Sequence, residues 1–208
     1  MVKVKLCGFK DLENLRAAIK SKADLIGFVF YAPSKRNIDP QEAGKIAQII
    51  PPQIKKVAVM VDPSDAAIAE VIEHLRPDFL QIHGGDANRI LAIKNKFNLP
   101  IIKALAIESA TDLAQIDDYQ NIADLFLFDA KSPEIGGSGT SFDWKILKNL
   151  QLPPEKWLLS GGLNEQNIEE AIEESGAAMV DLSSGIEVKK GEKSVDLIAN
   201  FMKKVKGS

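Results

Sequence analysis

The amino-acid sequence predicts an α/β fold: a single (β/α)8 TIM barrel, with a closed parallel sheet surrounded by outer helices. Three observations support this. Eight short, nearly continuous aliphatic runs recur along the chain, as expected for strands buried on both faces of a parallel sheet. The runs start between 21 and 32 residues apart, enough for a strand, a loop and a helix. Between them, apolar residues recur at helical spacing. We expect one domain over residues 1–208.

The predicted strands all have the same composition, short and rich in aliphatic and aromatic residues. They are Val4–Leu6, Leu25–Phe30, Lys56–Val61, Phe79–Ile82, Ile101–Ala104, Leu125–Phe128, Trp157–Ser160 and Met179–Leu182. An open doubly wound sheet is the alternative, but it usually has fewer strands. Its dinucleotide-binding form needs a G-x-G-x-x-G turn after the first strand, where this chain has Cys7-Gly8-Phe9-Lys10. The barrel is therefore favoured.

Helix start signals follow several of these strands. Asp39-Pro40-Gln41-Glu42 combines an N-cap aspartate with proline at the first helical position. Asp62-Pro63-Ser64-Asp65 repeats the pattern, and Asn164 is placed to cap the helix that contains Ile168. The helix between the fifth and sixth strands, in 110–119, is the weakest, and we expect it to be shortened.

Composition indicates an ordinary globular protein of 208 residues. The hydrophobic fraction is 45%, the charged fraction is 26% and the net charge is −3, which argues against a nucleic-acid-binding surface. We expect no membrane span and no signal peptide, because no apolar run is long enough. The single cysteine, Cys7, excludes an internal disulfide. A cytoplasmic location is the simplest expectation.

In a barrel, functional side chains lie where the strands end and the following loops begin. Cys7 ends the first strand, so it is either a small buried hydrophobic residue or a thiolate base or nucleophile. Asp129 ends the sixth strand. A carboxylate after a buried apolar run is costly unless it is paired or belongs to a site. We favour a catalytic role for Asp129 over a loop cap or an ion pair.

Two cationic or titratable side chains lie at the same end. Arg36, after the second strand, is the only one of the four arginines expected there; it would hold a carboxylate or phosphate, or be a surface charge. His83, after the fourth strand, either orients a substrate or is structural. The other histidine, His74, is expected late in a helix, so a metal site is not indicated.

Three glycine-rich turns are candidate anion-binding sites. They are Gly136–Thr140 after the sixth strand, Ser160-Gly161-Gly162 after the seventh and Ser183-Ser184-Gly185 after the eighth. Glycines let backbone N–H groups approach an anion, and the last two turns occupy the usual phosphate-binding positions of a barrel. The loop with Gly136–Thr140 is long enough to act as a lid. These observations predict an enzyme that acts on a small phosphorylated molecule.

Together, the motifs resemble those of the phosphoribosylanthranilate isomerase family of tryptophan biosynthesis. The matching segments run in family order over almost the whole chain. They are Lys5-Leu6-Cys7-Gly8, Gly27-Phe28-Val29-Phe30, Pro33-Ser34-Lys35-Arg36, Leu80-Gln81-Ile82-His83-Gly84, Phe128-Asp129-Ala130, Gly136-Gly137-Ser138-Gly139, Phe142-Asp143-Trp144, Leu159-Ser160-Gly161-Gly162-Leu163-Asn164 and Val180-Asp181-Leu182-Ser183-Ser184-Gly185-Ile186-Glu187.

The resemblance implies an Amadori rearrangement, in which N-(5-phosphoribosyl)anthranilate becomes 1-(2-carboxyphenylamino)-1-deoxyribulose 5-phosphate, without a cofactor or metal. It implies Cys7 as general base, Asp129 as general acid and Arg36 as the partner of the anthranilate carboxylate. The full substrate-binding set that we expect is Arg36, His83, Gly161, Gly162, Asp181, Ser183, Ser184 and Gly185. Departures from the family pattern are Ser138 in place of threonine, and the missing aspartate after Lys193.

Two alternatives remain at this point. One is another aminoaldose-phosphate isomerase barrel of the histidine pathway; such barrels use a pair of aspartates, and Cys7 at the end of the first strand speaks against it. The other is a non-catalytic phosphate-binding barrel, against which the presence of both Cys7 and Asp129 argues. The only partner that we expect is the phosphorylated small molecule, with no nucleic acid or membrane. The sequence leaves monomer and homodimer open.

Overall fold

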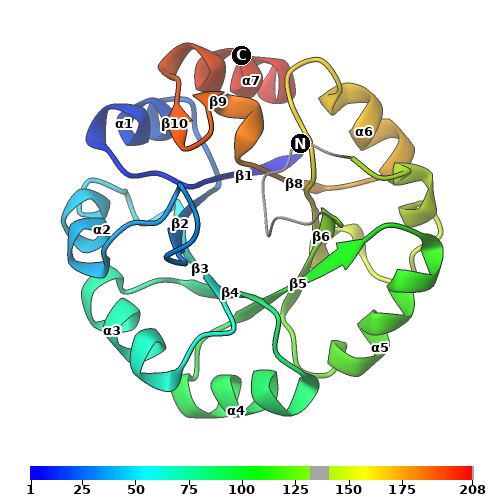
Figure 1. Cartoon of the computed structure of the whole chain (residues 1–208). Helices are drawn as coiled ribbons and strands as arrows, with labels where there is room; N and C mark the ends of the chain where they lie inside the picture. Colours follow the sequence, from blue (N-terminus) through cyan, green and yellow to red (C-terminus); the bar gives the residue numbers. More distant parts are fainter. Residues whose placement is uncertain (132–140, 208) are drawn as a thin grey trace.

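A computed structural model describes residues 1–131 and 141–207, and its centre is a closed barrel of eight parallel strands (Figure 1). Each strand pairs with the next, and the eighth pairs with the first. The strands are β1 (Lys3–Cys7), β2 (Leu25–Phe30), β3 (Lys55–Val61), β4 (Phe79–His83), β5 (Ile101–Ile107), β6 (Leu125–Ala130), β7 (Trp157–Leu159) and β8 (Met179–Leu182). Every predicted strand overlaps one of these, so the predicted barrel is confirmed.

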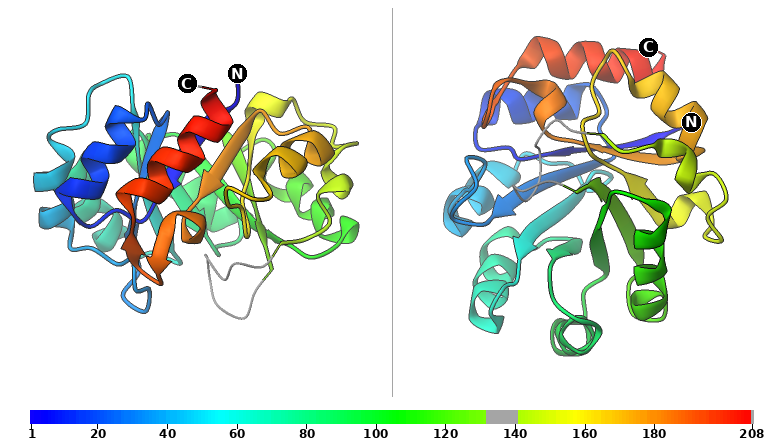
Figure 2. Two further views of the ribbon diagram at one scale, coloured as in Figure 1. Left: turned by 90° about the horizontal axis from the view of Figure 1, so that it is seen from above. Right: turned by 45° about the vertical axis from the view of Figure 1, so that its right-hand side comes forward.

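Helices surround the barrel as an outer ring (Figures 1 and 2). The α-helices are α1 (Leu12–Lys20), α2 (Pro40–Ala47), α3 (Asp65–Leu75), α4 (Ala87–Phe97), α5 (Ile116–Tyr119), α6 (Ile168–Ser175) and α7 (Val195–Lys206). Short 3₁₀ helices are η1 (Ala110–Gln115), η2 (Trp144–Leu147), η3 (Pro154–Lys156) and η4 (Ser184–Ile186). Within the described ranges, no helix has both the length and the apolar character that crossing a bilayer requires.

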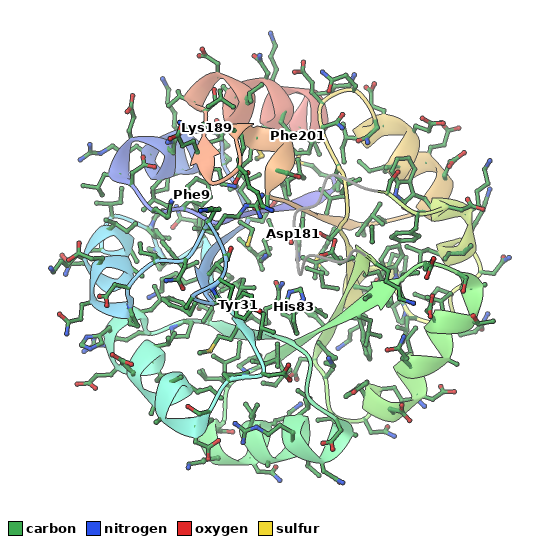
Figure 3. The ribbon with its side chains drawn as sticks, in the orientation of Figure 1. Phe9, Tyr31, His83, Asp181, Lys189 and Phe201 are labelled. Atoms are coloured by element: carbon green, nitrogen blue, oxygen red, sulfur yellow. The ribbon has the colours of Figure 1, made fainter. Side chains whose placement is uncertain are left out.

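Side chains alternate along each strand between the barrel interior and the layer under the helices. The interior cluster contains Cys7, Leu25, Val29, Val57, Val59, Ile102, Ala104, Leu127, Leu158 and Met179. The larger outer cluster joins the sheet to the helices, and Figure 3 shows one of its members, Phe201, on α7. Because this period is two, the inward-facing positions near the end of each strand determine which side chains reach the mouth of the barrel.

The short helix predicted in 110–119 is confirmed, because η1 and the four-residue α5 occupy that segment. A second shortening was not predicted. Residues 141–156, before β7, form the 3₁₀ helices η2 and η3 instead of an α-helix. Trp144 and Leu147 of η2 are nonetheless buried, and η2 packs beside α6. This turn therefore seals the outer side of the sheet.

The predicted start of α2 is confirmed: the Asp39 carboxylate accepts hydrogen bonds from the backbone N–H groups of Gln41 and Glu42. The start of α3 differs from the prediction. Its N-cap is Ser64, whereas Asp62 has a φ of +42° and accepts a hydrogen bond from the backbone N–H of Gly85 at 2.8 Å. Asp62 thus joins the loops after β3 and β4.

Asn164 does not cap α6 directly. Its Oδ1 accepts hydrogen bonds from the backbone N–H groups of Gln166 and Asn167, at 2.9 and 3.2 Å. These residues form the turn that leads into α6, which begins at Ile168. The asparagine therefore stabilises the turn that precedes α6 rather than the first residues of the helix itself.

A small antiparallel hairpin, β9 (Glu187–Lys189) and β10 (Glu192–Lys193), follows β8 and was not predicted. It lies at the end of the barrel opposite the two chain termini (Figure 2, left). Since β1 starts near the N-terminus, the hairpin is at the carboxyl end of the strands, where barrel enzymes place their sites.

Packing between α2 and α3 depends on Gly44. A Cβ on this residue would lie 2.5 Å from the carbonyl oxygen of His74. Alanine favours a helix over glycine by about 1 kcal/mol, but the overlap costs about 1–3 kcal/mol. We therefore expect Gly44→Ala to lower the free energy of unfolding measured by urea denaturation. The control Lys45→Ala, at an exposed position of α2, should change it by less than about 0.5 kcal/mol. A stabilised Gly44→Ala variant would contradict this packing.

Candidate active site

One pocket opens at the carboxyl ends of the strands, and most of the predicted site residues line it. These are Cys7, Arg36, His83, Asp129, Gly161, Gly162, Asp181, Ser183 and Ser184. They come from β1, β4, β6 and β8 and from the loops after β2, β7 and β8. Figure 3 shows His83 and Asp181 near the centre of the barrel. The fold therefore brings together residues that lie up to 177 positions apart in the sequence.

Gly185 is the exception in that set. A Cβ there would overlap the carbonyl oxygen of Leu163, in the loop after β7. Gly185 thus allows the loops after β7 and β8 to pack against each other behind the pocket wall. The predicted glycine turn Gly136–Thr140 lies outside the described residues.

Cys7 is the last residue of β1 and is 5% exposed. Its strand partner is Gly27 of β2, and a Cβ on Gly27 would lie only 2.7 Å from Cys7 Sγ. Glycine is therefore needed opposite the sulfur. Burial raises the pKa of the Cys7 thiol, while the nearby Lys5 ammonium acts in the opposite direction. At neutral pH, Cys7 is consequently mainly a neutral thiol.

Lys5 and Asp181 form an ion pair below Cys7. They face each other in register on β1 and β8, with Lys5 Nζ 2.8 Å from Asp181 Oδ1. The lysine side chain is 0% exposed and the aspartate side chain 8%. Burial works to lower the pKa of Lys5, but the charges of Asp181 and Cys7 outweigh it and the pKa is raised. Lys5 is therefore a permanent cation inside the barrel.

Asp129 lies on β6 and lines the same pocket. Burial, reinforced by the negative charge of Asp181, raises the pKa of its carboxyl to about 6. Hydrogen bonds from the backbone of Ala130 and the side chain of Ser160 oppose this rise but do not cancel it. A carboxyl with this pKa still carries its proton in a useful fraction of molecules near neutral pH, as a general acid must.

His83 ends β4 and contacts Gln81 through the imidazole Nε2, 3.0 Å from the amide Nε2. Burial lowers the pKa of His83 to about 3, and the positive charges of Lys5 and Lys103 contribute. The imidazole is therefore neutral at physiological pH. It can exchange hydrogen bonds with a substrate but brings no positive charge to the pocket.

Arg36 is held by Glu187 of the hairpin. Arg36 Nε lies 2.7 Å from Glu187 Oε1, and Nη2 lies 2.8 Å from Oε2. Lys193 Nζ lies 2.8 Å from the same Oε1 and also donates to the carbonyl oxygen of Ser183. Burial disfavours the Glu187 carboxylate, but hydrogen bonds and charges from Arg36 and Lys193 hold its pKa at about 2. A substrate carboxylate would have to approach another edge of the guanidinium.

Two glycines shape the turn after β7. Gly161 and Gly162 have φ angles of +91° and +65°, a region that side chains rarely adopt. A Cβ on Gly161 would also lie 2.6 Å from the backbone nitrogen of Ala130. The side chains of Asn164 and Asn167 donate to the Gly162 carbonyl oxygen, at 3.2 and 3.0 Å. The hydrogen bonds satisfy this oxygen and reduce its repulsion of a nearby anion, which makes the turn better suited to bind one.

Sequence reasoning gave no role to Lys5, Glu187 or Lys193, although each contacts a predicted site residue. It placed Ser160 in an anion-binding turn but did not predict its hydrogen bond to Asp129. A signal for Lys5 was present, because a lysine two positions before Cys7 shares its strand face. Glu187 and Lys193 belong to the unpredicted hairpin and had no comparable signal. No group of three or more histidine, cysteine or acidic side chains arranged to hold a metal ion occurs among the residues that the structure covers.

The Glu187 carboxylate neutralises two buried cations, so its removal should be costly. Side chains of Arg36, Glu187 and Lys193 are 6%, 3% and 1% exposed. We expect Glu187→Ala to lower the free energy of unfolding by about 3–5 kcal/mol, because two buried cations lose their shared carboxylate. Urea denaturation measures this. Glu192→Ala, which removes an exposed carboxylate of the same hairpin, should cost less than about 0.5 kcal/mol. Equal effects of both substitutions would contradict the stabilising role of Glu187 between Arg36 and Lys193.

Residues 4–204 match the family described as N-(5′-phosphoribosyl)anthranilate (PRA) isomerase. A relative of that name from Brucella suis is 44% identical over 207 residues, which covers 97% of this chain and 93% of the relative. The crystal structure of phosphoribosyl anthranilate isomerase from Thermotoga maritima superposes with a TM-score of 0.89, at 35% identity and full coverage of both chains.

A further similar structure is phosphoribosyl anthranilate isomerase in complex with reduced 1-(o-carboxyphenylamino)-1-deoxyribulose 5-phosphate. It has a TM-score of 0.85 and 32% identity, with full coverage of both chains. The Thermotoga maritima protein is described as dimeric, and monomers generated from it also have a known structure. The observed barrel and the sequence similarity thus point to the same family of proteins.

Proposed function

Since the chain belongs to the N-(5′-phosphoribosyl)anthranilate isomerase family, an isomerase family of tryptophan biosynthesis, we propose that Cys7 is its general base and Asp129 its general acid. The observation that carries this proposal is the position of both side chains in one pocket between the glycine turns and Arg36. The raised pKa of Asp129, about 6, suits an acid, and the thiolate of Cys7 is the group from β1 that can accept a proton.

The proposed reaction begins with ring opening. Asp129 donates its proton to the furanose oxygen as the C1–O bond breaks, which leaves a protonated Schiff base at C1. This cation makes the neighbouring C2–H acidic, and the Cys7 thiolate removes that proton. The electron pair of the C–H bond forms the C1–C2 double bond. The resulting enaminol becomes the ketone as its 2-hydroxyl loses a proton and C1 gains one. One acid and one base suffice for the Amadori rearrangement.

The ends of the substrate are assigned to the rim of the pocket. We propose that the turns with Gly161, Gly162, Ser183 and Ser184 take the phosphate, supported by the positive φ angles of Gly161 and Gly162 and by the place of the two turns after β7 and β8. Arg36 is proposed for the anthranilate carboxylate, and His83 for a neutral polar contact. A substrate held at both ends gains rate by orientation.

Asp181 has a different proposed role. Its carboxylate would repel a phosphate, and its Oδ1 is already bound to Lys5. We therefore assign Asp181 to holding Lys5 rather than to binding the substrate. Residues 1–208 are proposed to be one domain, and both monomer and homodimer remain compatible with the relatives. We propose a cytoplasmic enzyme, since a catalytic thiol needs a reducing environment.

Substitution of either group tests the assignment. We expect Cys7→Ala and Asp129→Asn each to lower kcat by about 10²–10⁴-fold, because each removes one proton transfer. Turnover is followed by the loss of anthranilate-linked fluorescence, and folding by circular dichroism. Asp117→Asn is the control, since this exposed carboxylate lies on α5 outside the pocket. Retained activity in either site variant would refute its assigned role.

The pH profile tests the order of the two pKa values. Below pH 6, Asp129 is protonated and the thiolate fraction rises with pH, so kcat/KM should rise. Between pH 6 and the raised pKa of Cys7, the gain in thiolate offsets the loss of protonated Asp129, so kcat/KM should stay level. Above the pKa of Cys7, activity should fall. A decline that begins near pH 6 would contradict this order. The fall of kcat/KM at high pH is the decisive part of the profile, because the substrate phosphate also titrates near 6 and affects the low-pH part.

A further inference from the structure

A buried cation lies on β1 beneath the pocket, and the reaction derived above has no use for it. Lys5 lies two residues before Cys7 on β1, so both side chains point into the barrel. Its Nζ is 2.8 Å from Asp181 Oδ1, and the side chain has no exposure to solvent. Replacing such a pair with apolar residues is often neutral or stabilising, so barrel stability alone gives little reason for it.

Gly27 shows how close the ammonium of Lys5 and the sulfur of Cys7 are. A Cβ built on Gly27 would lie 2.7 Å from Cys7 Sγ and 3.2 Å from Lys5 Nζ. The two atoms therefore border the same small space beside β2, and the missing side chain of Gly27 provides it. In this space the charge on Lys5 is poorly screened by water, so it acts strongly on the sulfur.

We propose that Lys5, fixed by Asp181, is a positioning residue that stabilises the thiolate of Cys7. This inference rests on the proposed role of Cys7 as general base. In the proton-transfer step the C2–H bond of the Schiff base breaks, an S–H bond forms, and the thiolate charge disappears. Lys5 would thus stabilise the reactive state before the transfer, while the phosphate and carboxylate of the substrate oppose it with their negative charges.

Other charged groups also face Cys7, and their positions distinguish Lys5 from them. Lys193 of β10 favours the thiolate, and Asp181 of β8 disfavours it. Arg36, from the loop after β2, also interacts with the sulfur by charge. Lys193 and Arg36 are bound to Glu187 just as Lys5 is bound to Asp181, so pairing does not distinguish the three cations. The position of Lys5 Nζ beside Sγ, next to Gly27, does distinguish it. Lys5 is the strongest of the influences that lower the pKa of Cys7, and burial is the main influence that raises it.

The single cysteine makes the test direct, because thiolate absorbance near 240 nm and alkylation by iodoacetamide report Cys7 alone. Both are measured on the full chain without substrate, as functions of pH. We expect Lys5→Met to raise the pKa of Cys7 by about one unit or more and to slow alkylation at pH 8 about tenfold. In the fluorescence assay, kcat should fall at least as much, with KM little changed.

Asp181→Asn should have the opposite effect on the thiol. It removes a negative charge near the sulfur, so the pKa of Cys7 should fall and alkylation should become faster. General damage to the fold would not produce changes of opposite sign. Because Lys5→Met leaves Asp181 unpaired, the double variant Lys5→Met/Asp181→Asn keeps the test valid if the single variant does not fold. Its thiol pKa should lie above that of the unmodified protein.

Lys103→Met is the matched control. This buried lysine of β5 donates to the backbone oxygens of Gly84 and Ala104 and does not contact Cys7. It should leave the thiol pKa unchanged, and Cys7→Ala supplies the blank for both signals. A folded Lys5→Met or double variant with an unchanged thiol pKa would overturn the inference. A shifted thiol pKa together with unchanged kcat would instead refute the proposed role of Cys7 as base.

Discussion

The ion pair between Lys5 and Asp181 lies at the position on which the rest of the site depends. It links β1 to β8 where the barrel closes, in the register that sets Cys7 one layer above. Because both charges are buried, neither strand can shift along the other without leaving a charge unpaired, at a cost of several kcal/mol. With the register of the strands fixed, the alternation of side chains along each strand determines that Asp129 and His83 face the pocket.

The same pair helps to set the protonation states of the acid and the base. Burial favours the neutral forms of both Cys7 and Asp129. The negative charge of Asp181 reinforces this at both groups, and the positive charge of Lys5 opposes it at both. At Asp129 the effect of Asp181 is the larger of the two, whereas at Cys7 the effect of Lys5 is the larger. A carboxyl that keeps its proton and a thiol that can lose it are the two states that the isomerisation needs. The division of roles therefore arises from the surroundings of the two groups as well as from their residue types.

Much of this was predictable from the sequence. Eight buried strands at regular spacing specify a barrel, and the barrel brings Cys7, Asp129 and the glycine turns to one end. The proximity of Lys5 Nζ to Sγ was not predictable, because it depends on the register of β1 against β2 and on the space left by Gly27. The pairing of Glu187 with Arg36 and Lys193 was not predictable either. Glu187 and Lys193 belong to strands of three and two residues, which are too short to show a periodic pattern in the sequence.

The differences in helix prediction have the same physical origin. Asp62 and Ser64 are both good caps, and the local sequence does not decide between them. A tertiary hydrogen bond does: Asp62 is used to hold the Gly85 amide in the next loop, which leaves Ser64 to begin α3. Likewise, η2 replaces an α-helix because burying Trp144 and Leu147 against α6 needs only one turn. The loops around the pocket are thus positioned by contacts between neighbouring βα units. Local sequence patterns predict the individual βα units. The contacts between neighbouring units determine the chemistry of the site, and local patterns do not specify these contacts.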